Sequence, residues 1–258
     1  MDRHHYLKYD YHNNFIHNCY ENFILNGGIK ITNGDEKQKY DFILSNNRLF
    51  VGHPIHACID IEILNEEVKI IWFGHSKNCI HWKNSKHMFL WSLIILFKNY
   101  PNITKISLGD DTRINCGKQY FPLSKYYFLK YGKLYYELYF NFQIYFFPIR
   151  KEKEYKNALT KREILKITKE WVNNFLLEIH ENKPEFLDLF NEKSELPIST
   201  YLSLFNKSIK EKYCNIFYIM INTYYDDFIN IYLPTDFYYN IKNKDSLITY
   251  LRNKINNL

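Results

Sequence analysis

The chain has 258 residues, of which 46% are hydrophobic, and its formal net charge is +6. This length can bury one large domain or one domain with an appendage, and the second arrangement is predicted. Because the lysines are scattered among Glu and Asn, the charge does not demand dedicated nucleic-acid binding, and nucleic acid is not an expected partner. The longest apolar stretch, Met88 to Phe97, is much shorter than the ~20 residues of a membrane span, so no membrane contact is expected.

The composition lowers the weight of single aromatic residues. Tyr 24 and Phe 20, together with abundant Ile, Lys and Asn, are residues that A+T-rich codons encode. The N-terminus carries no apolar signal core, and the cysteines are odd in number and form no CxxC pairs. We therefore expect no disulfide framework, a reducing compartment and a cytoplasmic location. The cysteines are Cys19, Cys58, Cys79, Cys116 and Cys214.

Short strand-like segments dominate the first part of the chain. Cys58, Asp60 and Glu62 alternate with isoleucines, as in a half-buried strand, and Asn65-Glu66-Glu67 then closes a predicted hairpin. The strands are predicted at 29–31, 40–44, 48–52, 57–64, 68–74, 103–108 and 142–149.

Two helices are predicted among these strands. Residues 86–99 are apolar all round, which marks a buried helix, and Pro101 ends it. Ser124 caps a second predicted helix that continues to Tyr139. Along that helix Tyr127, Tyr131, Tyr135 and Tyr139 recur every fourth residue, as in a packed stripe.

The order of these segments predicts a mixed twisted α/β sheet of about six or seven strands with two packed helices in residues 1–150. A charged linker at 150–156 and a mostly helical region in residues 151–258 follow, with a last helix capped by Asp245. We expect this helical region either to cover the first domain or to bind a protein partner.

The segment Tyr136-Glu137-Leu138-Tyr139-Phe140-Asn141-Phe142 resembles the Tyr-Glu-Lys-x-Gly-Phe segment that closes the fourth helix of the GNAT N-acyltransferases. The element order over residues 40–149 is also similar to the core of that fold, from its second strand through its sixth. The resemblance implies an α+β domain that binds acetyl-CoA between two splayed parallel strands, where an amine attacks the thioester directly. The resemblance extends to degenerate GNAT-like domains, as in uncharacterised proteins of large DNA viruses.

The resemblance also implies catalytic roles. A tyrosine on the fourth helix returns a proton to the departing thiolate, and its position corresponds to Tyr136, with Tyr135 as a possible substitute. A carboxylate near the end of a central strand would be the base, for which Asp110 and Asp111 are the candidates. A structural interpretation competes with this one, since Asp after Gly109 is typical of a turn cap.

The expected cofactor-binding residues surround the start of the helix at 86–99. In the family a glycine-containing loop brings backbone N–H groups to the CoA pyrophosphate, whereas this chain has no glycine between His81 and His87. An inactive relative that acts as a structural or interaction module is therefore the alternative to an active transferase. The candidate residues are Lys83, Asn84, Ser85, Lys86, His87, Phe73 and Gly74.

Three further chemistries remain open, although no metal is expected. Histidines and cysteines in the first third could converge on zinc, and Cys58, Cys79 or Cys116 could act as a nucleophile with Asp60 or Asp110 as the orienting carboxylate. Lysines interleaved with tyrosines could bind single-stranded nucleic acid. The zinc candidates are His53, His56, Cys58, His75, Cys79, His81 and His87, and the lysines are Lys125, Lys130 and Lys133.

Overall fold

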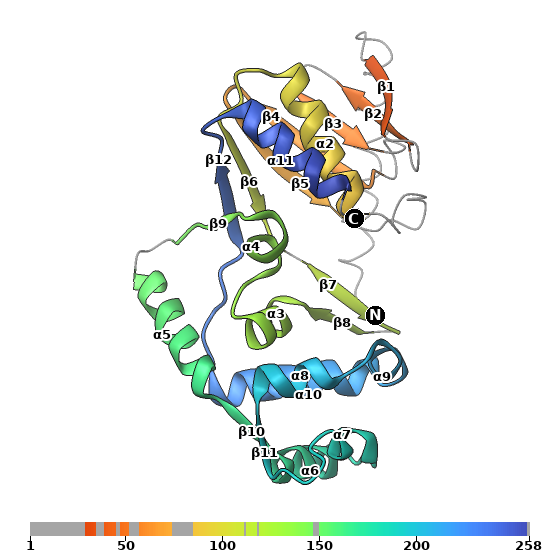
Figure 1. Cartoon of the computed structure of the whole chain (residues 1–258), viewed down its shortest axis with the longest axis vertical. Coiled ribbons are helices and arrows are strands. Elements are labelled where there is room, and N and C mark those ends of the chain that lie inside the picture. The colour runs from red at the N-terminus through yellow and green to blue at the C-terminus, as the bar shows by residue number, and fades with distance from the viewer. Residues whose placement is uncertain are drawn as a thin grey trace, which may run out of the picture. The chain divides into compact units, whose positions relative to one another are not determined.

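The computed structural model describes residues 29–34, 39–44, 47–51, 57–73, 85–110, 112–117, 119–146 and 150–256. Its contacts divide the chain into two compact units (Figure 1). The first comprises Met1–Gly109 and Tyr238–Leu258, and the second comprises Asp110–Phe237. The second unit is therefore an insertion in the first, whereas the sequence predicts a single boundary near residue 150.

The first unit is built on a mixed sheet, as predicted. Its strands are β1 Ile29–Gly34, β2 Lys39–Leu44, β3 Arg48–Val51, β4 Ile59–Leu64, β5 Glu67–Phe73, β6 Lys105–Gly109 and β12 Asp236–Asn240. The neighbours β1 to β5 are antiparallel, and β5 pairs with β6 in parallel. The strand order is β1-β2-β3-β4-β5-β6-β12-β9, where β9, Gln143–Ile144, belongs to the second unit.

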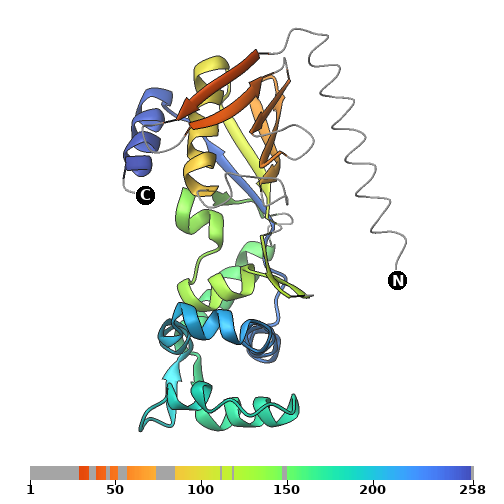
Figure 2. The same cartoon turned by 90° about the vertical axis from the view of Figure 1, so that its right-hand side faces the viewer.

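Helix α2, Ser85–Asn99, is the crossover that the parallel pair requires. It is buried on several sides, as its all-round apolar sequence predicts, because the C-terminal helix α11, Lys244–Asn256, also packs on it. Both helices lie on the same side of the sheet (Figure 2). The Asn243 side chain accepts the Ser246 backbone N–H at 2.9 Å, so the prediction of Asp245 as the cap of this helix was wrong.

The second unit is mostly helical, in agreement with the predicted helical C-terminal region. Its helices are α3 Ser124–Tyr131, α4 Tyr135–Phe140, α5 Arg150–Ile164, α6 Lys169–Glu178, α7 Pro184–Asp188, α8 Ile198–Leu204, α9 Lys207–Lys212 and α10 Cys214–Phe228. Two antiparallel strand pairs accompany these helices. They are β7 Arg113–Cys116 with β8 Gln119–Pro122, and β10 Lys166–Thr168 with β11 Glu195–Pro197. The predicted linker at 150–156 is the first half of α5.

The predicted helix from Ser124 to Tyr139 is two helices. Gly132 ends α3 with φ of 64°, and its N–H bonds to the Phe128 carbonyl. The buried Arg162 guanidinium donates hydrogen bonds to the next two carbonyls of α3, from Nε to Leu129 O at 2.9 Å and from Nη2 to Lys130 O at 2.6 Å. A cation at a helix C-terminus is favourable, so Arg162 stabilises the break.

We expect Gly132→Ala to lower the free energy of unfolding by about 1–2 kcal/mol, because a Cβ disfavours the left-handed region. The Arg162 guanidinium lies 3.6 Å or more from the added Cβ, so the cost is one of backbone angle and not of collision. Urea denaturation checks it. Gly109→Ala is the control, since nothing lies within 4 Å of its Cβ, and an equal loss in both variants would contradict the role of φ.

The second unit contains a disulfide between Cys116 on β7 and Cys214 at the start of α10, with 5.5 Å between their Cα atoms. Cys58 in the first unit is disulfide-bonded as well. The prediction that the chain has no disulfides was wrong, because cysteines 98 residues apart in sequence meet only in the fold. The odd number of cysteines and their wide spacing in the sequence do not indicate whether two distant cysteines pair in the fold.

We expect the double variant Cys116→Ala/Cys214→Ala to lose about 2–4 kcal/mol of unfolding free energy, because a long loop is no longer closed in the unfolded chain. Denaturation with and without a phosphine reductant measures the loss, and reductant should lower the stability of the wild type in the same direction. Alkylation of the native wild type without reductant, followed by mass spectrometry, is the control. Labelling of Cys116 and Cys214 there would contradict the bond.

Candidate functional site

The predicted catalytic residues Tyr135, Tyr136 and Asp110 come together in the second unit. Asp110 follows β6 directly, and both tyrosines open the short helix α4. Asp111 lies outside the described residues. Three of the side chains that the sequence resemblance indicates, those of Tyr135, Tyr136 and Asp110, therefore lie close together in the fold.

Tyr136 is 5% exposed and lies in an aromatic shell. Its ring centroid is 5.2 Å from that of Tyr135, 5.6 Å from Phe237, 6.0 Å from Phe140 and 6.2 Å from Phe142. Such a shell keeps water away from the ring and fixes its orientation. The hydroxyl is the only polar group of this side chain. Because the side chain is buried, the hydroxyl needs a hydrogen-bond partner inside the unit.

Thr112 is a polar side chain that acts on this hydroxyl, since it lowers the pKa of Tyr136 against the effects of burial and Asp110. The Thr112 hydroxyl donates to Asp110 Oδ1. The Thr112 backbone N–H bonds to the same carboxylate oxygen at 2.8 Å, which makes the turn after Gly109 that the sequence predicts for Asp110. Asp110 N–H in turn donates to Thr235 O at 2.5 Å.

The electrostatics of this cluster keep the tyrosines protonated. Burial raises the pKa of Tyr136, and the negative charge of Asp110 raises it further. Burial, Tyr139 and Asp110 raise the pKa of Tyr135 in the same way. A hydroxyl in this setting is a stable proton carrier and hydrogen-bond donor at neutral pH.

Glu137, the second residue of the family-like segment, has a structural role. Its Oε2 accepts the Leu134 backbone N–H at 2.8 Å and the Tyr155 hydroxyl at 3.2 Å. The first bond caps the start of α4, and the second attaches α4 to α5. Sequence reasoning missed Thr112 and Glu137, although a Glu three residues after a helix start is a recognisable capping signal.

The tyrosine stripe survives the break in the helix. Tyr127 on α3 contacts Tyr131, Tyr135 and Tyr139, with ring centroids between 5.3 and 6.0 Å apart. Burial raises the pKa of both Tyr127 and Tyr139. These rings therefore contact one another across the break between α3 and α4, and Tyr131 is 40% exposed instead of belonging to the core.

The predicted cofactor-binding residues that are described all belong to the first unit. Phe73 stacks on Phe89 of α2 at 4.8 Å, and His87 Nδ1 lies 2.6 Å from the Tyr40 hydroxyl. Burial, and then Lys254, lower the pKa of Lys86. Ser85 begins α2, whereas Gly74, Lys83 and Asn84 lie outside the described residues.

The parallel pair has an irregular end. Its register runs from Glu67 opposite Lys105 to Ile70 opposite Leu108. The next residue of β5, Ile71, is skipped in the pairing with β4, where Asp60 faces Trp72 and Ile61 faces Ile70. This β-bulge leaves Ile71 and Trp72 39% and 44% exposed, which is unusual for large apolar side chains of a central strand.

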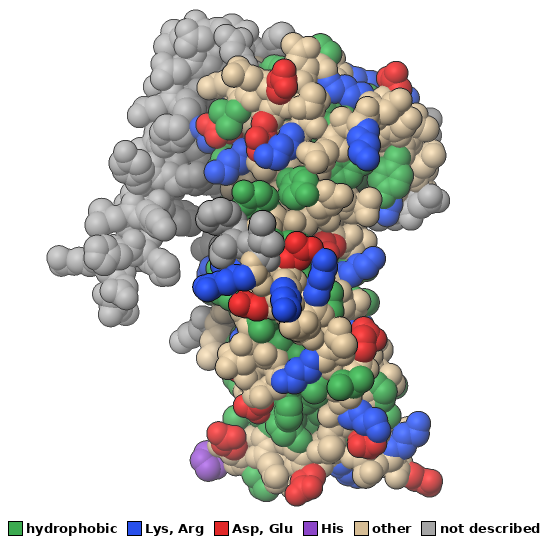
Figure 3. Space-filling model, turned by 90° about the vertical axis from the view of Figure 1, so that its left-hand side faces the viewer, with side chains coloured by type: hydrophobic (Ala, Val, Ile, Leu, Met, Phe, Trp, Pro, Cys, Tyr) green, Lys and Arg blue, Asp and Glu red, His purple; other side chains and the backbone are tan. Residues whose placement is uncertain are grey.

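The other chemistries receive less support. Among the described residues, no three His, Cys, Asp or Glu side chains are grouped to hold a metal ion, but His53, His56, His75, Cys79 and His81 are not among them. Cys58 and Cys116 are disulfide-bonded, so neither is a free nucleophile. On the face drawn in Figure 3, basic side chains lie beside acidic ones instead of forming a separate stripe.

In the described part of the chain, no helix has the length and apolarity to cross a membrane. No family model matches the chain, and neither a curated protein nor a solved structure is similar to it.

The buried tyrosines should make the protein sensitive to alkali. Because their pKa is raised in the folded state, the unfolded chain releases protons first, and the free energy of unfolding should fall as the pH rises above about 10. Urea denaturation at pH 7, 9 and about 10.5 measures this slope. The slope should be shallower in Tyr136→Phe.

Tyr232→Phe is the matched control, because this tyrosine is 71% exposed, and it should keep the slope of the wild type. Equal slopes in both variants would contradict the assignment to Tyr136.

Proposed function

We propose that the chain is an acyl-CoA-dependent N-acyltransferase in which Tyr136 is the general acid. The observation that carries the proposal is Tyr136, whose side chain is buried and whose hydroxyl is kept protonated by burial and by the negative charge of Asp110. In the reaction an amine nitrogen attacks the thioester carbonyl carbon, the C–N bond forms and the C–S bond breaks. The departing sulfur takes a proton from Tyr136, and Asp110 is the proposed acceptor of the amine proton.

The place of Asp110 in the chain supports this proposal. Open α/β sheets bind ligands at the carboxyl ends of their strands, and Asp110 directly follows the carboxyl end of β6, a strand of the parallel pair.

The environment of Tyr136 also defines what this acid does. Its pKa lies above that of an ordinary phenol, whereas an acid works best when its pKa is near the operating pH. The hydroxyl therefore acts mainly as a hydrogen-bond donor to the developing thiolate, with the proton passing late in the bond cleavage. Thr112 orients the hydroxyl and is a positioning residue.

The test is calorimetric titration with acetyl-CoA, followed by thiol release with a panel of primary amines. Tyr136→Phe should lower kcat by about 100-fold or more and leave acetyl-CoA affinity nearly unchanged. Tyr232→Phe is the control, because this tyrosine is 71% exposed and takes no part in the proposed site, and its kcat should change far less. Absence of heat with millimolar acetyl-CoA would overturn the proposal, as would unchanged turnover in Tyr136→Phe.

A structural or interaction module, for example of a virus, is the second candidate function. It is supported by apolar side chains that the second unit leaves exposed, with Ile164 at 77% and Leu177 at 64%. Neither side chain is required for packing inside the unit, so both are available to a partner. This candidate predicts that acetyl-CoA does not bind, and the same titration distinguishes the two.

A further inference from the structure

Two lysines of the second unit share one phenol oxygen. Lys130 on α3 and Lys210 on α9 each place Nζ 3.2 Å from the Tyr126 hydroxyl oxygen. Their ammonium groups can therefore be no further apart than two hydrogen bonds laid end to end. Two positive charges this close repel each other, so the arrangement has an electrostatic cost.

A second aromatic ring lies beside each ammonium group. Lys130 Nζ is 5.2 Å from the centroid of the Tyr131 ring, and Lys210 Nζ is 5.7 Å from that of Phe217. These cation–π contacts and the shared acceptor Tyr126 restrict both flexible side chains, so a ligand would find them already oriented.

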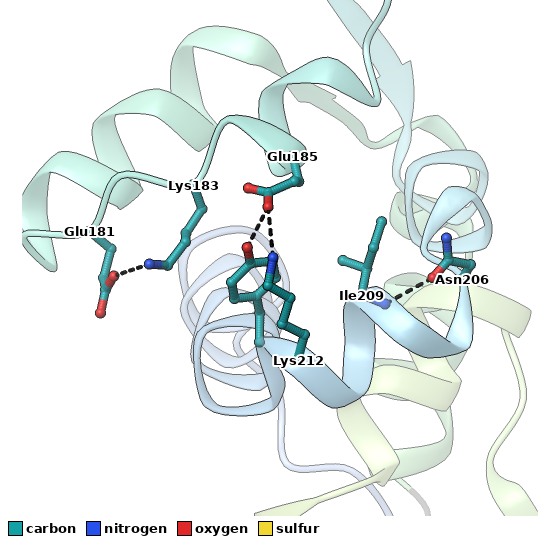
Figure 4. Close-up of polar contacts among 7 residues, drawn as sticks. Glu181, Lys183, Glu185, Asn206, Ile209 and Lys212 are labelled. Atoms are coloured by element: carbon teal, nitrogen blue, oxygen red, sulfur yellow. Dashed lines mark hydrogen bonds and ion pairs between the residues drawn. The ribbon is translucent and has the colours of Figure 1, made fainter.

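Neighbouring lysines have carboxylate partners, whereas no ion pair is found for these two among the described residues. On α9 itself, Lys207 pairs with Glu211 at 3.6 Å and Lys212 pairs with Glu185 at 3.3 Å. Figure 4 shows that Lys212 and a tyrosine hydroxyl meet on Glu185. In the described part of the chain, Lys130 and Lys210 thus differ from Lys207 and Lys212 in lying close together without an ion pair to a carboxylate.

The pKa directions fit this geometry. Burial lowers the pKa of Lys210, and the charge of Lys130 lowers it further. Burial is the largest single effect on Lys130 and lowers its pKa, but the combined effects of Tyr126 and Tyr131 outweigh it, and the pKa of Lys130 is raised. Burial raises the pKa of Tyr126, so its hydroxyl keeps its proton.

We propose that Lys130, Lys210 and Tyr126 form a binding site for a phosphate dianion. The two lysines use only lone pairs of the phenol oxygen, so the Tyr126 O–H remains available to a phosphate oxygen. Two ammonium groups match the charge of a phosphate group, and lysine binds phosphate as a point charge. An anion between the two cations would remove their repulsion.

The phosphate can be inorganic or part of a nucleotide. Tyr131 is 40% exposed and lies beside Lys130, so it offers a face on which a base could stack. Adenosine monophosphate and inorganic phosphate are therefore the two probes. This site is independent of the proposed acyltransferase function, because none of its residues takes part in that reaction.

The experiment is calorimetric titration of the full chain with each probe at low ionic strength. In Lys130→Gln/Lys210→Gln the affinity for inorganic phosphate should fall by about tenfold or more. The matched control is Lys133→Gln/Lys207→Gln, which removes two charges from the segment after α3 and from α9, and its affinity should stay within about twofold. Equal losses in the two variants, or no binding of millimolar phosphate to the wild type, would overturn the proposal.

Tyr126→Phe tests the shared oxygen, since it keeps the ring and removes only the hydroxyl. Its phosphate affinity should fall while its thermal unfolding midpoint stays near that of the wild type, and an unchanged affinity would overturn the site as described. Tyr131→Ala separates the two sources of phosphate. A loss for adenosine monophosphate alone supports a nucleotide ligand, and equal affinities of the two probes in the wild type support free phosphate.

Discussion

A parallel pair of strands cannot be closed by a tight turn, and much of the first unit follows from this constraint. The pairing of β5 with β6 requires a crossover, and the crossover is α2. A helix that is apolar all round needs cover on more than the sheet side, and α11 from the far end of the chain supplies it. The N- and C-terminal parts of the sequence belong to one unit through this packing and through the pairing of β12 with β6.

The same constraint explains why local patterns predict this unit well. The alternation around Asp60 and the hairpin at Asn65 are short-range signals, and both elements form where expected. What the sequence does not reveal is pairing over long distances. Nothing near residues 236–240 indicates that this strand joins β6, just as nothing near Cys116 indicates Cys214.

The errors in the second unit come from tertiary contacts that override local preference. The charged segment at 150–156 has the composition of a linker, but it forms the start of α5, whose buried Tyr155 is held by Glu137. Gly132 costs about 1 kcal/mol relative to Ala inside a helix, and the bonds of the Arg162 guanidinium to two carbonyls at the end of α3 further favour a helix end there. For the candidate site, the resemblance points to Tyr136 and Asp110, whereas Thr112, which joins them, is recognisable only in three dimensions.

The hydrogen bond from Asp110 N to Thr235 O has an evolutionary consequence. It holds the entry and the exit of the second unit against each other, although 125 residues separate them in the sequence. An insertion whose two ends meet in this way can vary in the length of its interior helices without moving the two strands that it joins, β6 and β12.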